Sequence, residues 1–150
     1  MPQTCRGACR ALTLFALGGM VYVVIEVLWR GRSHWSMLLL GGALFVVIGS
    51  MNEGVAWDTP LPIQALWGAL AVTAAELVAG CVLNLWLGLD VWDYTDMPLN
   101  LAGQICVPYA LLWMPLSAVA VVLDDWLRYR LWGGTRPHYH LWGSCNDGRT

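Results

Sequence analysis

Four long apolar segments alternate with short polar segments along the chain. The apolar segments span roughly residues 11–29, 35–54, 63–89 and 99–123. About 20 apolar residues suffice for an α-helix to cross a membrane. Between the second and third segments, the run Asp58-Thr59-Pro60-Leu61-Pro62 is typical of a break between helices. The pattern therefore predicts an all-α fold, a four-helix transmembrane bundle.

The composition strengthens this prediction. The chain is 58% hydrophobic and only 12% charged, whereas soluble domains carry about 25% charged residues. We therefore expect an integral membrane protein whose partner is the lipid bilayer. The bacterial cytoplasmic membrane is the expected location. Residues 1–132 should form the transmembrane domain and residues 133–150 a flexible polar tail. The net charge of −2 offers no basic surface for nucleic acid.

The arginines predict how the bundle is oriented. Positively charged residues that flank transmembrane helices accumulate on the cytoplasmic side. Five arginines precede the first segment or follow the fourth within about 15 residues, and two lie in the first connection, so we expect both termini in the cytoplasm. The first group is Arg6, Arg10, Arg128, Arg130 and Arg136, and the second is Arg30 and Arg32.

The strongest polar residues recur near the same end of each predicted helix. If the helices cross the membrane in alternation, these residues all lie at its outer face. An ionisable side chain at the centre of a bilayer costs about 2.5–3.5 kcal/mol on insertion scales, so several polar groups at one level predict a site there. The residues are Glu26, His34, Asn84, Asn100 and Gln104.

Helical periodicity places polar and small residues on shared faces. Each residue advances about 100° around a helix. Small residues let helices approach closely, and polar groups then hydrogen-bond across the contact. We therefore expect four such faces to meet inside the bundle. They are Gly19-Tyr22-Glu26-Arg30, Gly42-Phe45-Gly49, Thr73-Glu76-Gly80-Asn84 and Asn100-Gln104-Pro108.

The two acidic residues of these faces each have two interpretations. Glu76 lies about halfway along the third segment, where a carboxylate must meet a cation, accept hydrogen bonds or be protonated. It is either a structural group that ties helices together or a site for a proton, a cation or a substrate. Glu26 either pairs with Arg30 at i, i+4 or contacts a ligand amine or His34.

The third connection is acidic and aromatic. Asp93 belongs either to a solvated acidic loop or to a mouth that attracts cations, and its neighbours Trp92 and Tyr94 can present π faces to an organic cation. His34 is either a turn residue or, with Glu26 or Asp93, an acid/base group or a metal ligand. No spacing typical of a metal site supports a role for His34 as a metal ligand.

The amide side chains and prolines near the fourth segment also leave alternatives open. Asn84, Asn100 and Gln104 can either orient a small polar ligand or fasten the third helix to the fourth. Pro108 and Pro115 are expected to bend the fourth helix, because proline removes a backbone hydrogen bond.

Several spaced motifs between Gly18 and Trp113 resemble the ABC-transporter permease family called CmpB-like, or ABC-transporter type IV. The motifs are Gly18-Gly19-x-x-Tyr22-x-x-x-Glu26, Gly31-x-x-His34-Trp35-Ser36-Met37, Gly41-Gly42, Glu76-x-x-x-Gly80-x-x-x-Asn84, Trp92-Asp93-Tyr94-Thr95, Pro98-x-Asn100 and Gly103-Gln104-Ile105-Cys106. The resemblance implies a multi-pass membrane protein with a transport role and an uncharacterised substrate.

The mechanism that the family name implies needs a phosphate loop, which this chain does not supply itself. The chain has no GxxxxGK[ST] phosphate loop, so an ABC mechanism needs a separate ATPase subunit. Four helices leave little interior, which favours a homo-oligomer. The resemblance and the polar pattern together predict substrate-binding residues. These are Tyr22, Glu26, His34, Trp35, Glu76, Asn84, Trp92, Asp93, Tyr94, Asn100 and Gln104.

We therefore expect a transporter or permease-like protein that binds a small polar or cationic ligand in an intramembrane pocket near the outer face. Glu76 would form the floor of this pocket. We predict no catalytic residue, metal site or cofactor. The alternatives are a membrane-embedded enzyme that acts on a lipid-type substrate through His34, and a structural or regulatory membrane subunit.

Overall fold

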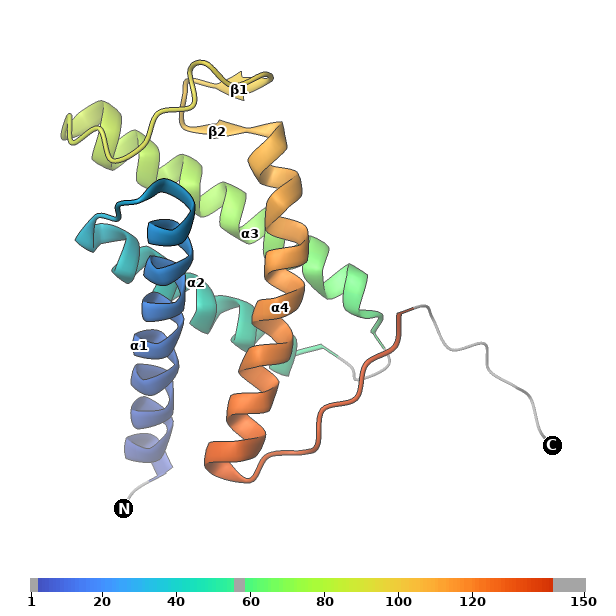
Figure 1. Cartoon of the computed structure of the whole chain (residues 1–150). Helices are drawn as coiled ribbons and strands as arrows, with labels where there is room; N and C mark the ends of the chain where they lie inside the picture. The colour runs from blue at the N-terminus through green and yellow to red at the C-terminus, as the bar shows by residue number, and fades with distance from the viewer. Residues whose placement is uncertain (1–2, 56–58, 142–150) are drawn as a thin grey trace.

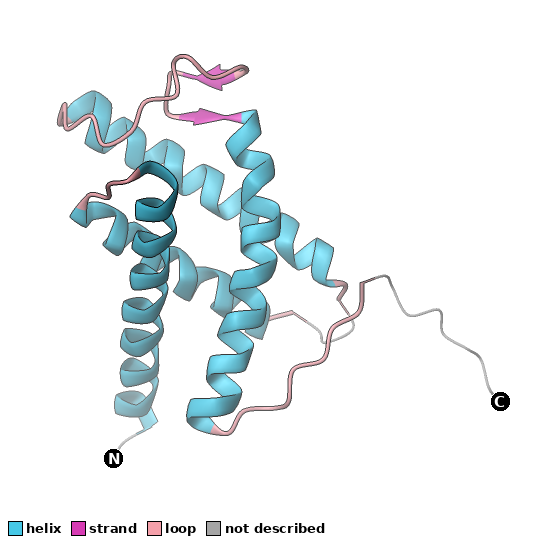
Figure 2. Cartoon of the chain, in the orientation of Figure 1, coloured by secondary structure: helices cyan, strands magenta, loops and turns pink. Residues whose placement is uncertain are grey.

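The structure is a computed structural model that describes residues 3–55 and 59–141. Asp58, in the predicted break, lies outside the described residues, as do residues 142–150 of the predicted tail. Helix α1 spans Gln3–Arg30, α2 spans Trp35–Glu53 and α3 spans Leu61–Gly80. A π-helical segment, η1, extends α3 over Cys81–Trp86, and α4 spans Val107–Trp132. A short antiparallel hairpin, β1 (Asn100–Leu101) and β2 (Ile105–Cys106), precedes α4 (Figures 1 and 2).

Four of these helical stretches are long and apolar enough to cross a membrane, namely Arg6–Arg30, Trp35–Glu53, Leu61–Trp86 and Val107–Trp132. The α1–α2 turn, the end of η1 and the β1–β2 hairpin lie together at one end of the bundle (Figure 1). We call this the hairpin end, and the opposite end, where α1 begins and α4 ends, the termini end.

The predicted start of the fourth helix at residue 99 is wrong. Residues 100–106 form the β1–β2 hairpin instead, because Leu99, Ala102 and Gly103 all adopt positive φ angles (55°, 52° and 66°) that no α-helix contains. The expected shared face of Asn100, Gln104 and Pro108 is therefore wrong as well. Pro108 lies in the first turn of α4, where proline needs no hydrogen-bond donor, so it does not bend the helix. Pro115 does lie inside α4.

The end of the fourth helix also differs from the prediction. The helix continues past residue 123 to Trp132, although the charged pair Asp124-Asp125 follows that position. It stops at Gly133, whose φ of 68° is the left-handed conformation of a helix C-cap. Both aspartates are buried inside the bundle.

Helices α1 and α2 pack closely through glycines. The backbone carbonyl of Phe15 lies so near Gly42 that a Cβ built on Gly42 would be 2.6 Å from that oxygen. Cβ atoms on Gly18 and Gly41 would overlap the rings of Phe45 and Tyr22. The predicted small-residue face of the second helix is thus confirmed as a buried contact.

We expect the Gly42→Ala variant to lose about 1–3 kcal/mol of unfolding free energy, because an added methyl group forces a well-packed contact apart. The matched control is Gly7→Ala in the same helix pair, since a Cβ on Gly7 meets nothing within 4 Å. That control should be neutral or up to about 1 kcal/mol more stable, because alanine is the better helix former. Chemical unfolding in mixed micelles measures both, and equal effects would contradict the close-contact argument.

The bundle consists of two helix pairs. Helix α1 packs mainly on α2, and α3 packs mainly on α4. One core cluster, Leu44, Ile48, Val72 and Val121, joins α2, α3 and α4. A second, Met37, Val91 and Trp92, lies under the loop at the hairpin end. Helices α1 and α4 run beside each other (Figure 1), and the space between the two pairs contains the main cavity.

Candidate functional site

A cavity of about 350 Å³ lies between the two helix pairs and borders α1, α2, α4, Val72 of α3 and the loop before the hairpin. Its walls are mostly aliphatic along the length of the bundle. Near the hairpin end the walls become aromatic and charged. The aromatic and charged lining residues there are Tyr22, Trp29, Trp92, Tyr94, Tyr109, Trp113, Glu26 and Arg30.

The charged part of the wall is a local ion pair on α1. Glu26 is 7% exposed and accepts hydrogen bonds from the Arg30 guanidinium and the Ser33 hydroxyl. The spacing of four residues places Glu26 and Arg30 one above the other on a helix. The predicted i, i+4 pair is therefore present, and it neutralises the Glu26 carboxylate at the cavity wall.

Aromatic rings from three parts of the chain surround this end of the cavity. Tyr22 of α1 stacks on Trp113 of α4, with ring centroids 6.1 Å apart, and Tyr94 of the loop stacks on Tyr109 of α4 at 4.8 Å. The Trp29 indole N–H donates to the Tyr109 hydroxyl at 3.3 Å. The Tyr22–Trp113 and Trp29–Tyr109 contacts connect α1 to α4 across the cavity, so the aromatic wall forms only in the folded bundle.

Glu76 lies behind this aromatic wall and is 2% exposed. The Trp113 indole N–H donates to its Oε2 at 2.7 Å, and the Tyr94 hydroxyl donates a weaker bond to its Oε1 at 3.5 Å. Among the described residues no arginine or histidine forms an ion pair with Glu76. Burial, and then the nearby Glu76, raise the pKa of the Tyr94 hydroxyl, which keeps it protonated as a donor.

Asn84 and Gln104 form a separate buried network above the cavity. The Asn84 amide donates to the Trp92 carbonyl at 2.9 Å and to Gln104 Oε1 at 2.8 Å, and Asn84 Oδ1 accepts from the Val91 N–H at 2.8 Å. The Trp92 indole donates to the Gln104 carbonyl at 3.0 Å. The hydrogen-bonding groups of Asn84 are therefore used to hold the loop against η1 and the hairpin.

Asn100 and Asp93 shape the exposed turns of the same loop. Asn100 donates to the carbonyls of Thr95 and Met97 at 3.0 and 2.8 Å, and its Oδ1 accepts from the Gly103 N–H at 3.1 Å. Asp93 accepts from the N–H and hydroxyl of Thr95 at 2.9 and 3.0 Å. Neither residue lines the cavity.

His34 and Trp35 also lie away from the cavity. His34 is the N-cap of α2, where its Nδ1 accepts from the Ser36 N–H at 3.3 Å and lies 2.7 Å from the Ser36 hydroxyl. Trp35 is 68% exposed. Within the described residues no hydrogen bond or ion pair joins His34 to Glu26 or Asp93, and no group of His, Cys, Asp and Glu is arranged to hold a metal ion.

The structure thus divides the predicted site residues into groups. Tyr22, Glu26, Trp92 and Tyr94 line the cavity, and Glu76 lies directly behind it. The remaining six form the loop network, the exposed turns and the start of α2. Three wall residues were not predicted from the sequence, namely Trp29, Tyr109 and Trp113. The signal was present in the spacing of Tyr109 and Trp113, four residues apart on one face of a helix.

A second polar cluster, at the termini end, was not predicted. Asp124 is fully buried and accepts from the Arg128 guanidinium at 2.6 Å. Asp125 accepts from the Asn52 amide at 2.6 Å and from the Tyr139 hydroxyl at 2.8 Å. Burial, followed by a hydrogen bond to Asp125, raises the pKa of Tyr139. This cluster ties α2, α4 and the segment after α4 together.

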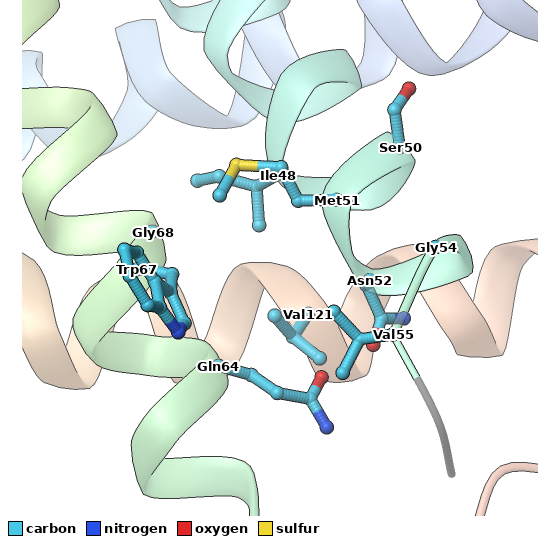
Figure 3. A pocket seen from close by; sticks show the side chains of 10 residues that line it. All are labelled: Ile48, Ser50, Met51, Asn52, Gly54, Val55, Gln64, Trp67, Gly68 and Val121. Atoms are coloured by element: carbon cyan, nitrogen blue, oxygen red, sulfur yellow. The ribbon is translucent and has the colours of Figure 1, made fainter. Parts of the chain in front are cut away.

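Two smaller cavities lie beside this cluster. One, of about 280 Å³, lies between the C-terminal part of α2 and the N-terminal part of α3, with Met51 and Asn52 on one side and Gln64 and Trp67 on the other (Figure 3). The other, of about 180 Å³, is lined by polar residues including Glu53 and Asp125. Among the described residues, the first has no carboxylate in its lining, and in the second Tyr139 is the single tyrosine, tryptophan or phenylalanine.

Four apolar helices and an internal cavity define a multi-pass membrane protein. The family model described as "Putative ABC-transporter type IV" matches residues 12–132, and the chain belongs to this family. The predicted resemblance is thereby confirmed. The chain is also similar to Protoheme IX farnesyltransferase 1 of Paramagnetospirillum magneticum, at 33% identity over 102 residues, which is 65% of this chain and 30% of that protein. The chain thus spans less than a third of that relative's length. No solved structure matches the chain.

Proposed function

We propose that this protein is the ligand-binding membrane subunit of a transporter, and that it binds a small organic cation in the main cavity. The observation that carries the proposal is the aromatic wall next to Glu76. Rings such as those of Tyr22, Tyr94 and Trp113 attract a cation through their negative faces, and aromatic cages are a recognised way to bind quaternary ammonium groups.

The charges beside the cavity favour a cation over a neutral ligand. Arg30 neutralises Glu26, whereas Glu76 accepts hydrogen bonds only from neutral donors among the described residues. Glu76 therefore has no ion-pair partner among the described residues, although it lies within a stretch that can span the membrane. Such groups are costly, and they typically belong to substrate or ion pathways. A ligand ammonium group in the aromatic cage would supply the missing positive charge.

The proposal also includes an orientation in the membrane, a separate ATPase subunit and a homo-oligomer. We place the hairpin end at the outer face and both termini in the cytoplasm, because the arginines concentrate at the termini end. Since the sequence contains no phosphate loop, transport would need a separate ATPase subunit, which fits the family of the chain. A homo-oligomer would provide more transmembrane helices than a single copy does.

A membrane enzyme that acts on an isoprenoid is the second candidate, and the name of the relative, a protoheme IX farnesyltransferase, is what favours it. The geometry gives it less support, because His34 Nδ1 is engaged by Ser36. Mass spectrometry of the purified chain incubated with a prenyl diphosphate tests this candidate. Product formation that is lost in His34→Ala would favour the enzyme over the transporter.

Choline and its neutral isostere dimethylbutanol test the cation proposal directly, because the two compounds differ in charge but hardly in shape. We expect choline to stabilise the purified full chain by about 2.7 kcal/mol at a concentration 100 times its dissociation constant. Dimethylbutanol should have no such effect. Thermal unfolding in lipid nanodiscs measures both. Equal effects of the two compounds, or no effect of either, would contradict the proposal.

A further inference from the structure

The main cavity is much longer than a small cation requires. Its lining on α4 extends from Tyr109 to Leu123, which corresponds to roughly 21 Å of helical rise. On the opposite side it reaches Gly18 of α1 and Ile48 of α2. Beyond the aromatic end the lining is mostly aliphatic, and Phe45 and Ser117 are the exceptions. The shape is therefore a polar head region followed by a long apolar slot.

The slot opens sideways, between α1 and α4. Val21 of α1 and Val119 of α4 both line the cavity, yet 41% and 62% of their surfaces are exposed. Residues that both line a cavity and are exposed form its rim. Both lie within stretches that can span the membrane, so the opening faces lipid rather than water.

The contacts between α1 and α4 lie on either side of this opening. The Trp29–Tyr109 hydrogen bond and the stacked rings of Tyr22 and Trp113 close the gap toward the hairpin end. Near the termini end, the Arg10 guanidinium lies 5.1 Å from the centre of the Trp132 ring. The route that we assign to a narrow chain, from the bilayer into the slot, lies between the Tyr22–Trp113 pair and the Arg10–Trp132 contact.

The geometry points to a single-chain amphiphile with an ammonium head as the ligand, which reaches the cavity laterally from the bilayer. The head occupies the aromatic cage and the hydrocarbon chain lies in the slot between α1 and α4. This inference rests on the proposed function and adds the chemical class of the ligand and its route. Two features argue for this occupant: the charge of Glu76 complements the head, and the aliphatic slot continues directly from the cage.

The head also lies at a suitable depth for an amphiphile. Glu26, on the cavity wall, is one helical turn from Arg30, where α1 ends. A bound head would therefore lie near the headgroup layer, and its chain would run toward the middle of the bilayer, parallel to the surrounding lipid tails. The ligand would enter without turning its polar group through the hydrocarbon core, which is costly.

A pair of tryptophan variants on α4 tests the inference. Val119→Trp places a large ring at the rim of the slot, whereas Val122→Trp adds the same ring at an exposed position of α4 outside the cavity lining (38% exposed). The probes are choline and hexadecyltrimethylammonium, titrated into full-length protein in nanodiscs. Because both proteins see the same lipid, partitioning of the long-chain probe into the bilayer cancels in the comparison.

We expect Val119→Trp to weaken hexadecyltrimethylammonium binding about tenfold or more, a change of about 1.4 kcal/mol, and to leave choline binding unchanged. Val122→Trp should change neither. The pair Val21→Trp and Val24→Trp on α1 repeats the test, since Val21 lines the cavity and Val24 is exposed outside that lining.

Other outcomes separate this inference from the proposed function. If choline binds but Val119→Trp leaves long-chain binding unchanged, the chain slot is wrong and the cation site stands. If neither cation binds the unmodified protein, both proposals fail. Val119→Cys chains that cross-link to each other in the bilayer would show that a second copy covers the opening, which would overturn lateral access by an amphiphile.

Discussion

The Asn84→Ala variant is expected to lose about 3 kcal/mol or more of unfolding free energy. Asn84 is 7% exposed and makes three hydrogen bonds, to Val91, Trp92 and Gln104. Alanine removes the amide and leaves three buried partner groups unsatisfied, and each such group costs about 1–3 kcal/mol. Reversible unfolding in mixed micelles measures the loss. The fluorescence of the ten tryptophans, which include Trp92 of the same network, should shift at lower denaturant than in the unmodified protein.

Asn100→Ala is a closely matched control for this prediction. Asn100 also makes three hydrogen bonds through its side-chain amide and lies in the hairpin that Asn84 contacts through Gln104, but it is exposed. Water can replace the lost partners there, so we expect a loss of about 0.5–1.5 kcal/mol. A loss at Asn84 no larger than the loss at Asn100 would mean that the buried network does not hold the loop in place.

The helical faces of α1, α2 and α3 could be predicted from the sequence because they depend on local periodicity alone. Counting along the helices placed Glu26, Glu76 and Asn84 inside the bundle, and all three are buried. The glycines of α1 and α2 were similarly recognisable, since close helix contacts need small residues. Helical periodicity did not predict which residues form hydrogen bonds with these side chains. Asn84 bonds to Gln104, and these two residues come together only through the loop between them.

The hairpin before α4 could not be predicted because its sequence resembles the helix that follows it. Residues 99–106 are mostly apolar and continue directly into α4. Their conformation depends on Leu99 and Ala102, which adopt left-handed φ angles that cost non-glycine residues energy. The hydrogen bond from Gly103 N–H to Asn100 and the contact of Gln104 with Asn84 stabilise this turn. The second contact depends on tertiary structure.

The C-terminal end of α4 could not be predicted from the local sequence either. A pair of aspartates after an apolar run is typical of a helix that has left the membrane. Here the pair is buried, because Arg128, Asn52 and Tyr139 supply partners from three different segments. Of these partners, only Arg128 lies four residues from Asp124 on the same helix. Helical periodicity can therefore predict this contact but not the other two.

The candidate site was partly predictable for the same reason. Tyr22 and Glu26 share a helical face, and Trp92 and Tyr94 were chosen because their rings lie in an acidic loop. Tyr109 and Trp113 were missed although they share a helical face, because aromatic residues are common in transmembrane segments. Their importance arises from the stacking on Tyr94 and Tyr22, which requires the fold.

We expect the Glu76→Gln variant to bind choline about tenfold more weakly or worse, a change of at least about 1.4 kcal/mol. Glutamine keeps a carbonyl oxygen that can accept from the Trp113 indole and an amide that can donate toward Tyr94, so the packing is preserved. It removes the charge that the cationic ligand would balance. Because a buried carboxylate without a cationic partner is costly, the fold should be as stable as before or more stable. Choline titration and thermal unfolding, measured on the same sample, separate the two effects.

Glu53→Gln controls for the loss of one negative charge. Glu53 is 56% exposed at the termini end, where Arg128 lies 3.8 Å away, and its charge is screened by water and salt at that distance from the cage. Choline affinity should not change in this variant. If Glu76→Gln binds choline normally, the aromatic wall does not need the carboxylate and the cation proposal loses its electrostatic basis. If Glu76→Gln unfolds the protein, the carboxylate primarily locks α3 to α4 through Trp113, and the structural interpretation of Glu76 is the correct one.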